Sequence, residues 1–329
     1  MGDPMSKRLI VLLTFLSVAV IVGSYVTIPY YSEAPGPAKD VEPLIQFSGH
    51  QRYDSSGHFV LTSVLESVQR LTPIAALGAW LDPNRAVVPE QDLLFPGESQ
   101  QQEQQRATSD MDESKLDAVA AVLSDLDDYP KRHGDGALVE SVIAGCPAEG
   151  KLFPGDLITA VDGKTVMLRR QLTNTLETVP VGQPIHFAVT AGGSSETVTL
   201  SRAKCGQNGA PLVGISTLQN FPFKVTISSA DIGGPSAGLM WALGLYDLLT
   251  PADLTGGMTI AGTGAIDRDG NVYPIGGVGE KLIAARRAGA DVFFVPQQNL
   301  AEARAADAGV RLVPVSSLQD ALDFLKSAG

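Results

Sequence analysis

The sequence is poor in cysteine, histidine and basic residues, and each shortage argues against a class of protein. Only two cysteines, Cys146 and Cys205, occur among 329 residues, too few for a disulfide-rich scaffold or a cysteine-rich zinc site. The four histidines are scattered and lack the HExxH spacing of zinc proteases. Lys and Arg number 24 against 36 Asp and Glu, which gives a formal charge of −12 and argues against nucleic-acid binding.

Complete cofactor motifs are also missing. Asp267 stands where a dinucleotide fingerprint beginning at Gly262 needs its third glycine, and Val272 stands where a calcium loop needs glycine. We therefore expect no metal, no cofactor and no nucleic acid. Whether Cys146 and Cys205 form a disulfide cannot be deduced from their positions in the sequence, and both alternatives stay open.

One long apolar run is present, from Leu9 to Ile28. It has no charged residue and about the 20 residues that a helix needs to cross a bilayer. Lys7 and Arg8 precede it, which favours a cytoplasmic N-terminus. A cleaved signal peptide, whose apolar core is usually about 7–15 residues, and a buried core helix are the alternatives. We expect a cytoplasmic tail over 1–8, a transmembrane helix over 9–28 and the rest of a single-pass membrane protein outside the cytoplasm.

The next part of the chain carries no chemical motif. Residues 29–40 contain Pro35, Gly36 and Pro37 and are predicted as a linker. Residues 41–130 mix strand-like and helical stretches with a spacer over 100–114 that is rich in Gln and acidic residues. We assign no function to this segment.

Residues 131–205 have the pattern of a compact β-rich unit. The stretches Cys146–Gly150, Pro154–Ile158 and Val161–Gly163 resemble the matching stretches of PDZ domains. That resemblance implies a groove in which an extended peptide adds as a strand. The alternative is a PDZ fold that only separates its neighbours.

The PDZ resemblance also suggests which residues bind a peptide. By position, the groove strand begins at Ala137 and the loop that receives a carboxylate lies just before it. The expected substrate-binding residues are Gly134, Gly136, Ala137, Leu138 and Val139.

A serine follows a glycine–proline turn near the start of the last third of the chain. Ser236 comes after Gly234 and Pro235 and opens an apolar stretch over 239–249 that reads as a buried helix. Free backbone N–H groups at such a helix start can stabilise an oxyanion. Ser236 is therefore a candidate nucleophile, and a simple helix N-cap is the alternative.

A lysine on a second predicted helix is the candidate base. Lys281, Ala284, Ala285 and Ala288 share one face by helical spacing, so the lysine points toward the apolar side. Burial disfavours the ammonium and lowers the pKa of a lysine, which suits it to take a proton from a serine. Pairing with Glu280 is the alternative, although that neighbour faces elsewhere.

These residues resemble the proteolytic domain of the Lon family. Gly234–Gly238 matches its nucleophile motif, Pro274–Leu282 its lysine motif, and Thr263 its threonine. The resemblance, assigned to a domain over 206–329, implies a catalytic Ser236–Lys281 dyad. It also implies supporting roles for Thr263, which helps to hold the lysine, and for Gly234 and Pro235.

The complete pattern resembles bacterial membrane-anchored, PDZ-containing, Lon-like serine proteases. No GxxxxGK[ST] motif occurs, and this class is implied to work without ATP. We expect an α+β chain with a transmembrane helix, a PDZ domain and a Lon-type proteolytic domain. The implied function is an endopeptidase that cleaves extracytoplasmic or membrane-associated proteins, with the PDZ domain recognising or gating substrates, in a homo-oligomer. An inactive peptide-binding adaptor on the same fold is the alternative.

Overall fold

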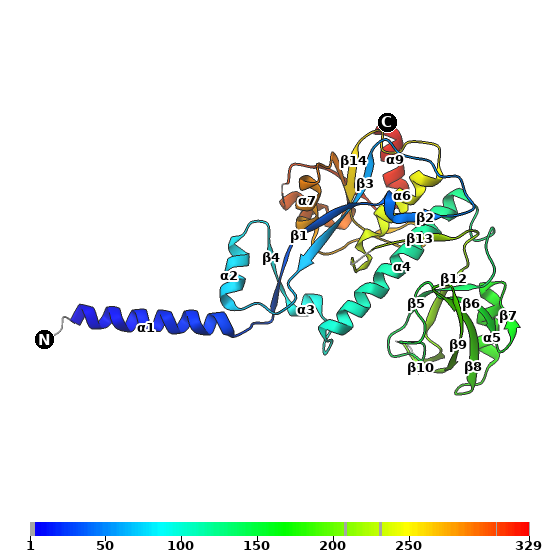
Figure 1. Cartoon of the computed structure of the whole chain (residues 1–329), viewed down its shortest axis with the longest axis horizontal. Helices are drawn as coiled ribbons and strands as arrows, with labels where there is room; N and C mark the ends of the chain where they lie inside the picture. Colours follow the sequence, from blue (N-terminus) through cyan, green and yellow to red (C-terminus); the bar gives the residue numbers. More distant parts are fainter. Residues whose placement is uncertain (1–3, 207–208, 230–231, 307, 329) are drawn as a thin grey trace.

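The computed structural model describes residues 4–206, 209–229, 232–306 and 308–328. A separate helix, α1 (Pro4–Tyr25), extends away from a central body in which helices flank a sheet, and a smaller β-rich unit lies beside that body (Figure 1). Residues 1–3 of the predicted tail lie outside the described residues, and α1 begins within that tail at Pro4.

Helix α1 is shorter than the apolar run predicted. It ends at Tyr25, so only 17 residues of the run that starts at Leu9 are helical, against about 20 for a bilayer. Three β-branched residues and then Pro29 follow, and both features disfavour helix. Within the part of the chain that the structure describes, no helix is both long and apolar enough to cross a membrane. The predicted transmembrane helix over 9–28 and the single-pass location are therefore wrong, whereas the α+β class of the remaining chain is confirmed.

The central sheet draws on both halves of the chain. Its strand order is β18–β17–β14–β3–β1–β4. The parallel strands are β3 (His58–Glu66), β14 (Thr259–Gly262), β17 (Val292–Pro296) and β18 (Arg311–Val315). Strand β1 (Tyr30–Asp40) runs antiparallel to both β3 and β4 (Ala86–Pro89). Residues 30–89 thus complete a sheet whose other strands lie after residue 258.

Strand β1 occupies the segment predicted as a linker. The pairing of β1 with β3 shifts register between Pro35 and Ala38, which puts the proline and glycine residues in a bulge. A Cβ on Gly36 would come 2.8 Å from the Ser63 carbonyl oxygen, so only glycine fits this close approach. Proline and glycine here mark an irregular strand and not a linker.

Side chains alternate across the sheet and build two helical layers. Phe59 and Leu61 of β3 pack with α4 (Gln100–Leu126), α6 (Gly238–Leu249) and α9 (Leu318–Ala328). Val60 faces the other layer, made of α7 (Val278–Arg287) and α8 (Leu300–Ala305). This two-residue period is the signature of a strand buried on both faces.

Helix α4 includes the predicted spacer. It begins with a capping box formed by Ser99 and Gln102 and continues unbroken for 27 residues. Its first half is mostly polar, whereas residues 117–123 are buried against the core that contains α6. The Gln- and acid-rich residues over 100–114 are therefore the polar half of a long packed helix.

The β-rich unit has its own sheet and core. Its strand order is β12 (Ile215–Gln219), β5 (Ala137–Val142), β6 (Leu157–Val161), β8 (Pro184–Ala191) and β9 (Ser194–Ser201), and β7 (Lys164–Thr165) pairs with β6. Helix α5 (Arg169–Thr178) contributes Leu172 to the core, beside Ile158 and Phe187. Strand β12 forms one edge of this sheet.

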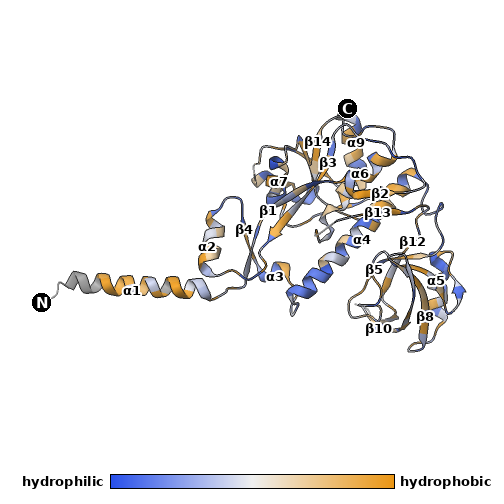
Figure 2. Ribbon diagram, viewed as in Figure 1, coloured by the Kyte–Doolittle hydropathy of each residue, from blue (hydrophilic) through white to orange (hydrophobic). Residues whose placement is uncertain are grey.

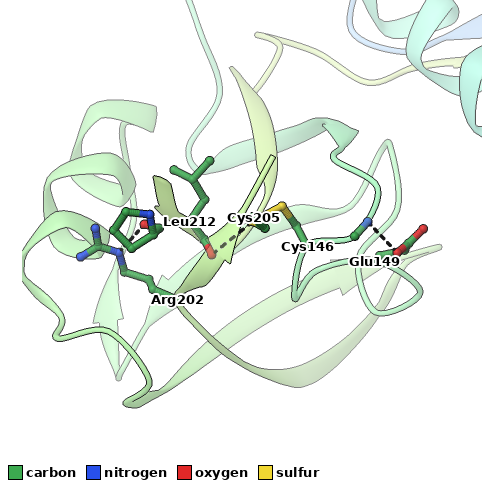
Figure 3. Close-up of a disulfide and its surroundings, with 7 residues drawn as sticks. Cys146, Glu149, Arg202, Cys205 and Leu212 are labelled. Carbon is green, nitrogen blue, oxygen red and sulfur yellow. Dashed lines mark hydrogen bonds between the residues drawn. A yellow bond between two sulfur atoms is a disulfide. The ribbon is translucent and has the colours of Figure 1, made fainter. Parts of the chain in front are cut away.

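A disulfide joins Cys146 and Cys205, which the sequence left open (Figure 3). It ties the hairpin of β10 (Ala203–Cys205) and β11 (Ala210–Leu212) to the turn before Glu149. Around it, Gly145 N donates to the Glu149 carboxylate at 2.9 Å, and Arg202 Nε donates to the Pro211 carbonyl at 3.0 Å. The disulfide therefore steadies the segment that leads into β12.

Shorter elements complete the chain. They are η1 (Glu42–Leu44), β2 (Ile45–Phe47), α2 (Pro73–Leu81), α3 (Glu90–Leu93), β13 (Val225–Ile227), η2 (Pro235–Ala237), β15 (Ala265–Ile266), β16 (Val272–Tyr273) and η3 (Gln297–Asn299). Strand β13 pairs with β2, and β15 pairs with β16. Figure 2 shows many apolar residues along α1 and α2, and Trp80 of α2 is 73% exposed.

Candidate active site

Ser236 lies in the short η2 turn that leads into the buried helix α6. Gly234 begins this turn with a φ of 79°, a left-handed value that favours glycine. The residue that caps α6 is Ala237, not Ser236, and no side chain caps the helix. The Ser236 hydroxyl is therefore not used as the N-cap that the sequence offered as the alternative.

Lys281 reaches the Ser236 side chain from α7. Its Nζ lies 2.8 Å from Ser236 Oγ, and the lysine is only 5% exposed. Gly277, in the left-handed conformation with a φ of 67°, caps the helix one turn before the lysine. The structure thus brings together the two residues that the sequence singled out on separate helices.

Burial controls the charge of this lysine. It lowers the pKa of Lys281 to about 8, although the carboxylates of Glu33, Glu66, Glu302 and Glu280 act in the opposite direction. A lysine with such a pKa is partly neutral in mildly alkaline solution, and a neutral amine can accept a proton. The pair therefore has the geometry and the proton affinity for nucleophile activation.

Thr263 contacts the backbone of the serine. Its hydroxyl donates to the Ser236 carbonyl oxygen at 3.0 Å, and Gly264 N donates to the same oxygen at 2.8 Å. Thr263 is 1% exposed and follows directly after β14. The resemblance implied that this threonine holds the lysine, whereas its hydrogen bond in the structure holds the backbone of the nucleophile.

Helix α4 secures the turn from the other side. Gly234 N donates to the Ala107 carbonyl at 2.7 Å, and Ser114 Oγ donates to the Pro235 carbonyl at 2.9 Å. The Gly234 N–H is thus occupied and Pro235 has no N–H, so over residues 234–236 only the Ser236 N–H is left free by these contacts to stabilise an oxyanion. Sequence reasoning missed Ala107 and Ser114 because no local pattern distinguishes them from other helical residues.

The expected peptide-binding residues of the β-rich unit lie in the interior of its sheet. Strand β5 pairs with β12 on one edge and β6 on the other. Ala137 and Val139 are fully buried and Leu138 is nearly so, while Gly134 and Gly136 exchange backbone hydrogen bonds with Asn220. A peptide cannot add beside a strand whose two edges are already paired, so this groove assignment is wrong.

The sheet edge next to α5 belongs to β12. The Gln219 side chain accepts a hydrogen bond from Arg169 N at 2.8 Å and donates to the carbonyls of Gly134, Gly136 and Met167. These bonds fix the end of β12 against the start of α5. Sequence reasoning missed β12 because it lies beyond residue 205, where the unit was expected to end.

Across the described ranges, no group of three or more His, Cys, Asp and Glu side chains is placed to hold a metal ion.

Two parts of the chain match known protein families. Residues 224–325 match the family described as the Lon protease (S16) C-terminal proteolytic domain, and residues 115–201 match the PDZ domain. A similar relative is a Lon protease of Aster yellows witches'-broom phytoplasma, 40% identical over 26% of this chain and 11% of that protein. Another is Lon protease 2 of Bacillus subtilis, 34% identical over 32% of this chain and 18% of that protein.

A solved structure is also similar to part of this chain. The PDZ domain of an SdrC-like protein from Listeria innocua is 29% identical, and the match covers 25% of this chain and 93% of that one with a TM-score of 0.24. The chain spans less than a fifth of the length of the curated relatives named above. Together with the serine and lysine geometry, the family matches establish that this chain contains a Lon protease C-terminal proteolytic domain and a PDZ domain.

Proposed function

We propose that this chain is a serine endopeptidase in which Ser236 and Lys281 form a catalytic dyad. The observation that carries the proposal is the 2.8 Å separation of Lys281 Nζ and Ser236 Oγ, with the lysine buried. A buried lysine within reach of a serine hydroxyl is the arrangement that nucleophilic catalysis needs. The homology of residues 224–325 to a protease domain supports the same reading.

The chemistry proceeds in two steps. Neutral Lys281 takes the proton of Ser236 while the serine oxygen attacks the peptide carbonyl, and the resulting ammonium returns a proton to the leaving amine. Water then attacks the acyl-enzyme, Lys281 accepts a proton from that water, and Ser236 is released with its hydroxyl restored. Neither step consumes a nucleotide, so we expect hydrolysis without ATP.

Covalent labelling tests this proposal against the inactive adaptor. A fluorophosphonate probe is expected to modify Ser236 in the wild-type chain, and an unstructured protein such as casein is expected to be cleaved in the absence of ATP. Ser236→Ala is the matched control for both signals. Absence of labelling and of cleavage by folded wild-type protein would favour the adaptor.

We further propose that peptide segments of substrates bind along β12. An edge strand presents unpaired backbone groups to which an extended peptide can add, and α5 lies beside this edge. Chemical-shift mapping with an unstructured substrate and the Ser236→Ala chain tests the site. Shifts concentrated on β12 and α5 are expected, whereas shifts confined to the proteolytic domain would contradict it.

We also propose that the chain forms a homo-oligomer. The exposed apolar side chains of α1 and α2, including Trp80, form a surface that contact between copies would cover. Mass photometry is expected to detect a homo-oligomer, and a single monomeric species over micromolar concentrations would count against it.

A further inference from the structure

A buried carboxyl group near the dyad has no role in the chemistry above. Glu33, on β1, is 9% exposed and lies directly opposite Glu66 of β3 in the antiparallel register. Like charges at such positions repel each other. Within the described part of the chain, burial and neighbouring charges, and no hydrogen bond, are what shift the pKa of the Glu33 carboxyl.

The carboxyl packs against the helix that carries the lysine. A Cβ built on Gly277, the cap of α7, would lie 3.4 Å from Glu33 Oε2. Lys281 is one helical turn further, since its N–H donates to the Gly277 carbonyl at 3.1 Å. The carboxyl therefore lies beside the first turn of the helix that aims the lysine at Ser236.

Four carboxylates act on Lys281, each from a different place. They are Glu33 on β1, Glu66 on β3, Glu280 beside the lysine on α7, and Glu302 on α8. Glu33 exerts the strongest influence of the four on Lys281 and combines this with deep burial, whereas Glu302 is exposed and Glu280 is half-buried. Water screens an exposed charge far more than a buried one, so Glu33 is the dominant partner.

We propose that Glu33 is a positioning residue for the dyad, whose buried negative charge stabilises the ammonium that Lys281 forms when it takes the serine proton. This proposal rests on the proposed function. In this role the Glu33 carboxylate makes Lys281 a stronger base when the serine attacks the peptide. The opposing effects of burial and of Glu33 then set the pH range in which the lysine is both neutral enough and basic enough to act.

A charge effect of Glu33 on Lys281 changes the pH dependence of hydrolysis, which a purely structural role of Glu33 would not do. Removing the charge with Glu33→Gln leaves the shape of the side chain but makes Lys281 lose its proton at lower pH. The rising limb of kcat/KM against pH should therefore move to lower pH. The plateau at alkaline pH should fall by about threefold or more, because a weaker base accepts the serine proton less readily. The wild-type and Glu33→Gln curves are thus expected to cross.

Burial also acts on Glu33 itself, and only above its raised pKa does the carboxyl carry the negative charge that this role needs. Burial, followed by the charges of Glu66 and Glu280, raises the pKa of Glu33 to about 7. Glu33 and Lys281 then titrate in adjacent ranges, and the measured midpoints belong to the pair and not to one residue. The comparison must accordingly use the whole pH profile and not a single pH.

Two measurements test the inference. The first is the pH profile of peptide hydrolysis by wild type, Glu33→Gln, Glu33→Asp and the control Glu302→Gln, each checked for folding by circular dichroism. The second is an NMR titration of the Lys281 side chain in Ser236→Ala, with and without Glu33→Gln, assigned by comparison with Lys281→Arg.

The expected result is a lower Lys281 titration midpoint and a crossing pH profile for Glu33→Gln, a much smaller change for Glu302→Gln, and partial recovery in Glu33→Asp. An unchanged Lys281 midpoint in Glu33→Gln would overturn the inference even if the dyad is active. If hydrolysis by wild type is absent while the NMR midpoint still moves, the influence of Glu33 on the lysine stands and the proposed function fails.

Discussion

The proposed activation of Ser236 depends on residue 281 being a lysine. An ammonium that is 5% exposed has lost most of its hydration, and its pKa falls to about 8 because burial outweighs the surrounding carboxylates. An arginine at this position would stay charged throughout the accessible pH range and could not act as a base. The identity of the side chain therefore matters more here than its charge.

Lys281→Arg and Ser236→Ala should each lower kcat for peptide hydrolysis by about a thousandfold or more, because the two residues act as one unit. The double variant should be no worse than either single variant. Peptide hydrolysis between pH 6 and pH 10 checks this, with circular dichroism confirming the fold. Substantial turnover by Lys281→Arg at any of these pH values would mean that another group is the base.

The Thr263 hydroxyl offers a second test at the residue scale. Its hydrogen bond goes to the Ser236 carbonyl, so Thr263→Val should lower kcat by about tenfold without moving the pH midpoint. Thr263→Ser keeps the donor and should retain most of the activity. A shift in midpoint for Thr263→Val would instead support the role on the lysine that the resemblance implied.

At the scale of elements, the sequence predicted what local patterns encode. The apolar stretch of α6, the inward face of α7 and the hairpin signals of the PDZ region all have local periodicity or turn residues. The sequence also singled out Ser236, Lys281 and Thr263, which lie in recognisable motifs. Strand β1 was missed because the proline and glycine of its bulge read as a linker, and β12 because its pairing partner lies about 75 residues earlier in the chain. Contacts such as Ala107 and Ser114 with the nucleophile turn depend on tertiary packing alone.

The disulfide of the PDZ domain gives an element-scale prediction. The disulfide closes a loop with a sequence separation of 59. Changing both Cys146 and Cys205 to serine should therefore lower the free energy of unfolding of this domain by about 2–4 kcal/mol. Because the hairpin precedes β12, peptide binding should weaken as well. Urea unfolding of reduced and oxidised protein, followed by domain-resolved hydrogen exchange, checks this. Equal rates of hydrogen exchange in β12 with and without the disulfide would show that the disulfide does not stabilise β12.

At the scale of the whole molecule, the two domains share charged contacts. Arg268, on the hairpin after Thr263, forms an ion pair with Glu140 of β5, which is 2% exposed. Asp117 of α4 lies close to the same carboxylate, and its Oδ1 atom is buried without a partner among the described residues. The junction between the PDZ and proteolytic domains therefore contains more buried acid than base, in keeping with the acidic chain as a whole.

Buried acidic groups at this junction and within the proteolytic domain together predict an unusual dependence of stability on pH. Burial is the main cause that raises the pKa of Asp117 and Glu42 to about 8 and that of Glu113 and Glu33 to about 7. Between about pH 4.5 and pH 8 the folded chain keeps protons that the unfolded chain has lost, so stability falls as pH rises through that range. The temperature of half-unfolding should accordingly be higher at pH 5.5 than at pH 8.5.

Asp117→Asn isolates one contribution to that trend. The amide stays neutral at every pH and can donate to Glu140, so the variant should be more stable than wild type at pH 8.5 by about 1–2 kcal/mol. At pH 5.5 the folded wild-type chain keeps the Asp117 proton and the unfolded chain has lost it, but the pH is closer to the ordinary pKa of an aspartate, so the difference between the two proteins should be smaller than at pH 8.5. Thermal unfolding of both proteins across this range measures the difference. Parallel curves for the two proteins would mean that Asp117 does not hold its proton in the folded chain, and that the acidic junction is ionised and stabilised in another way.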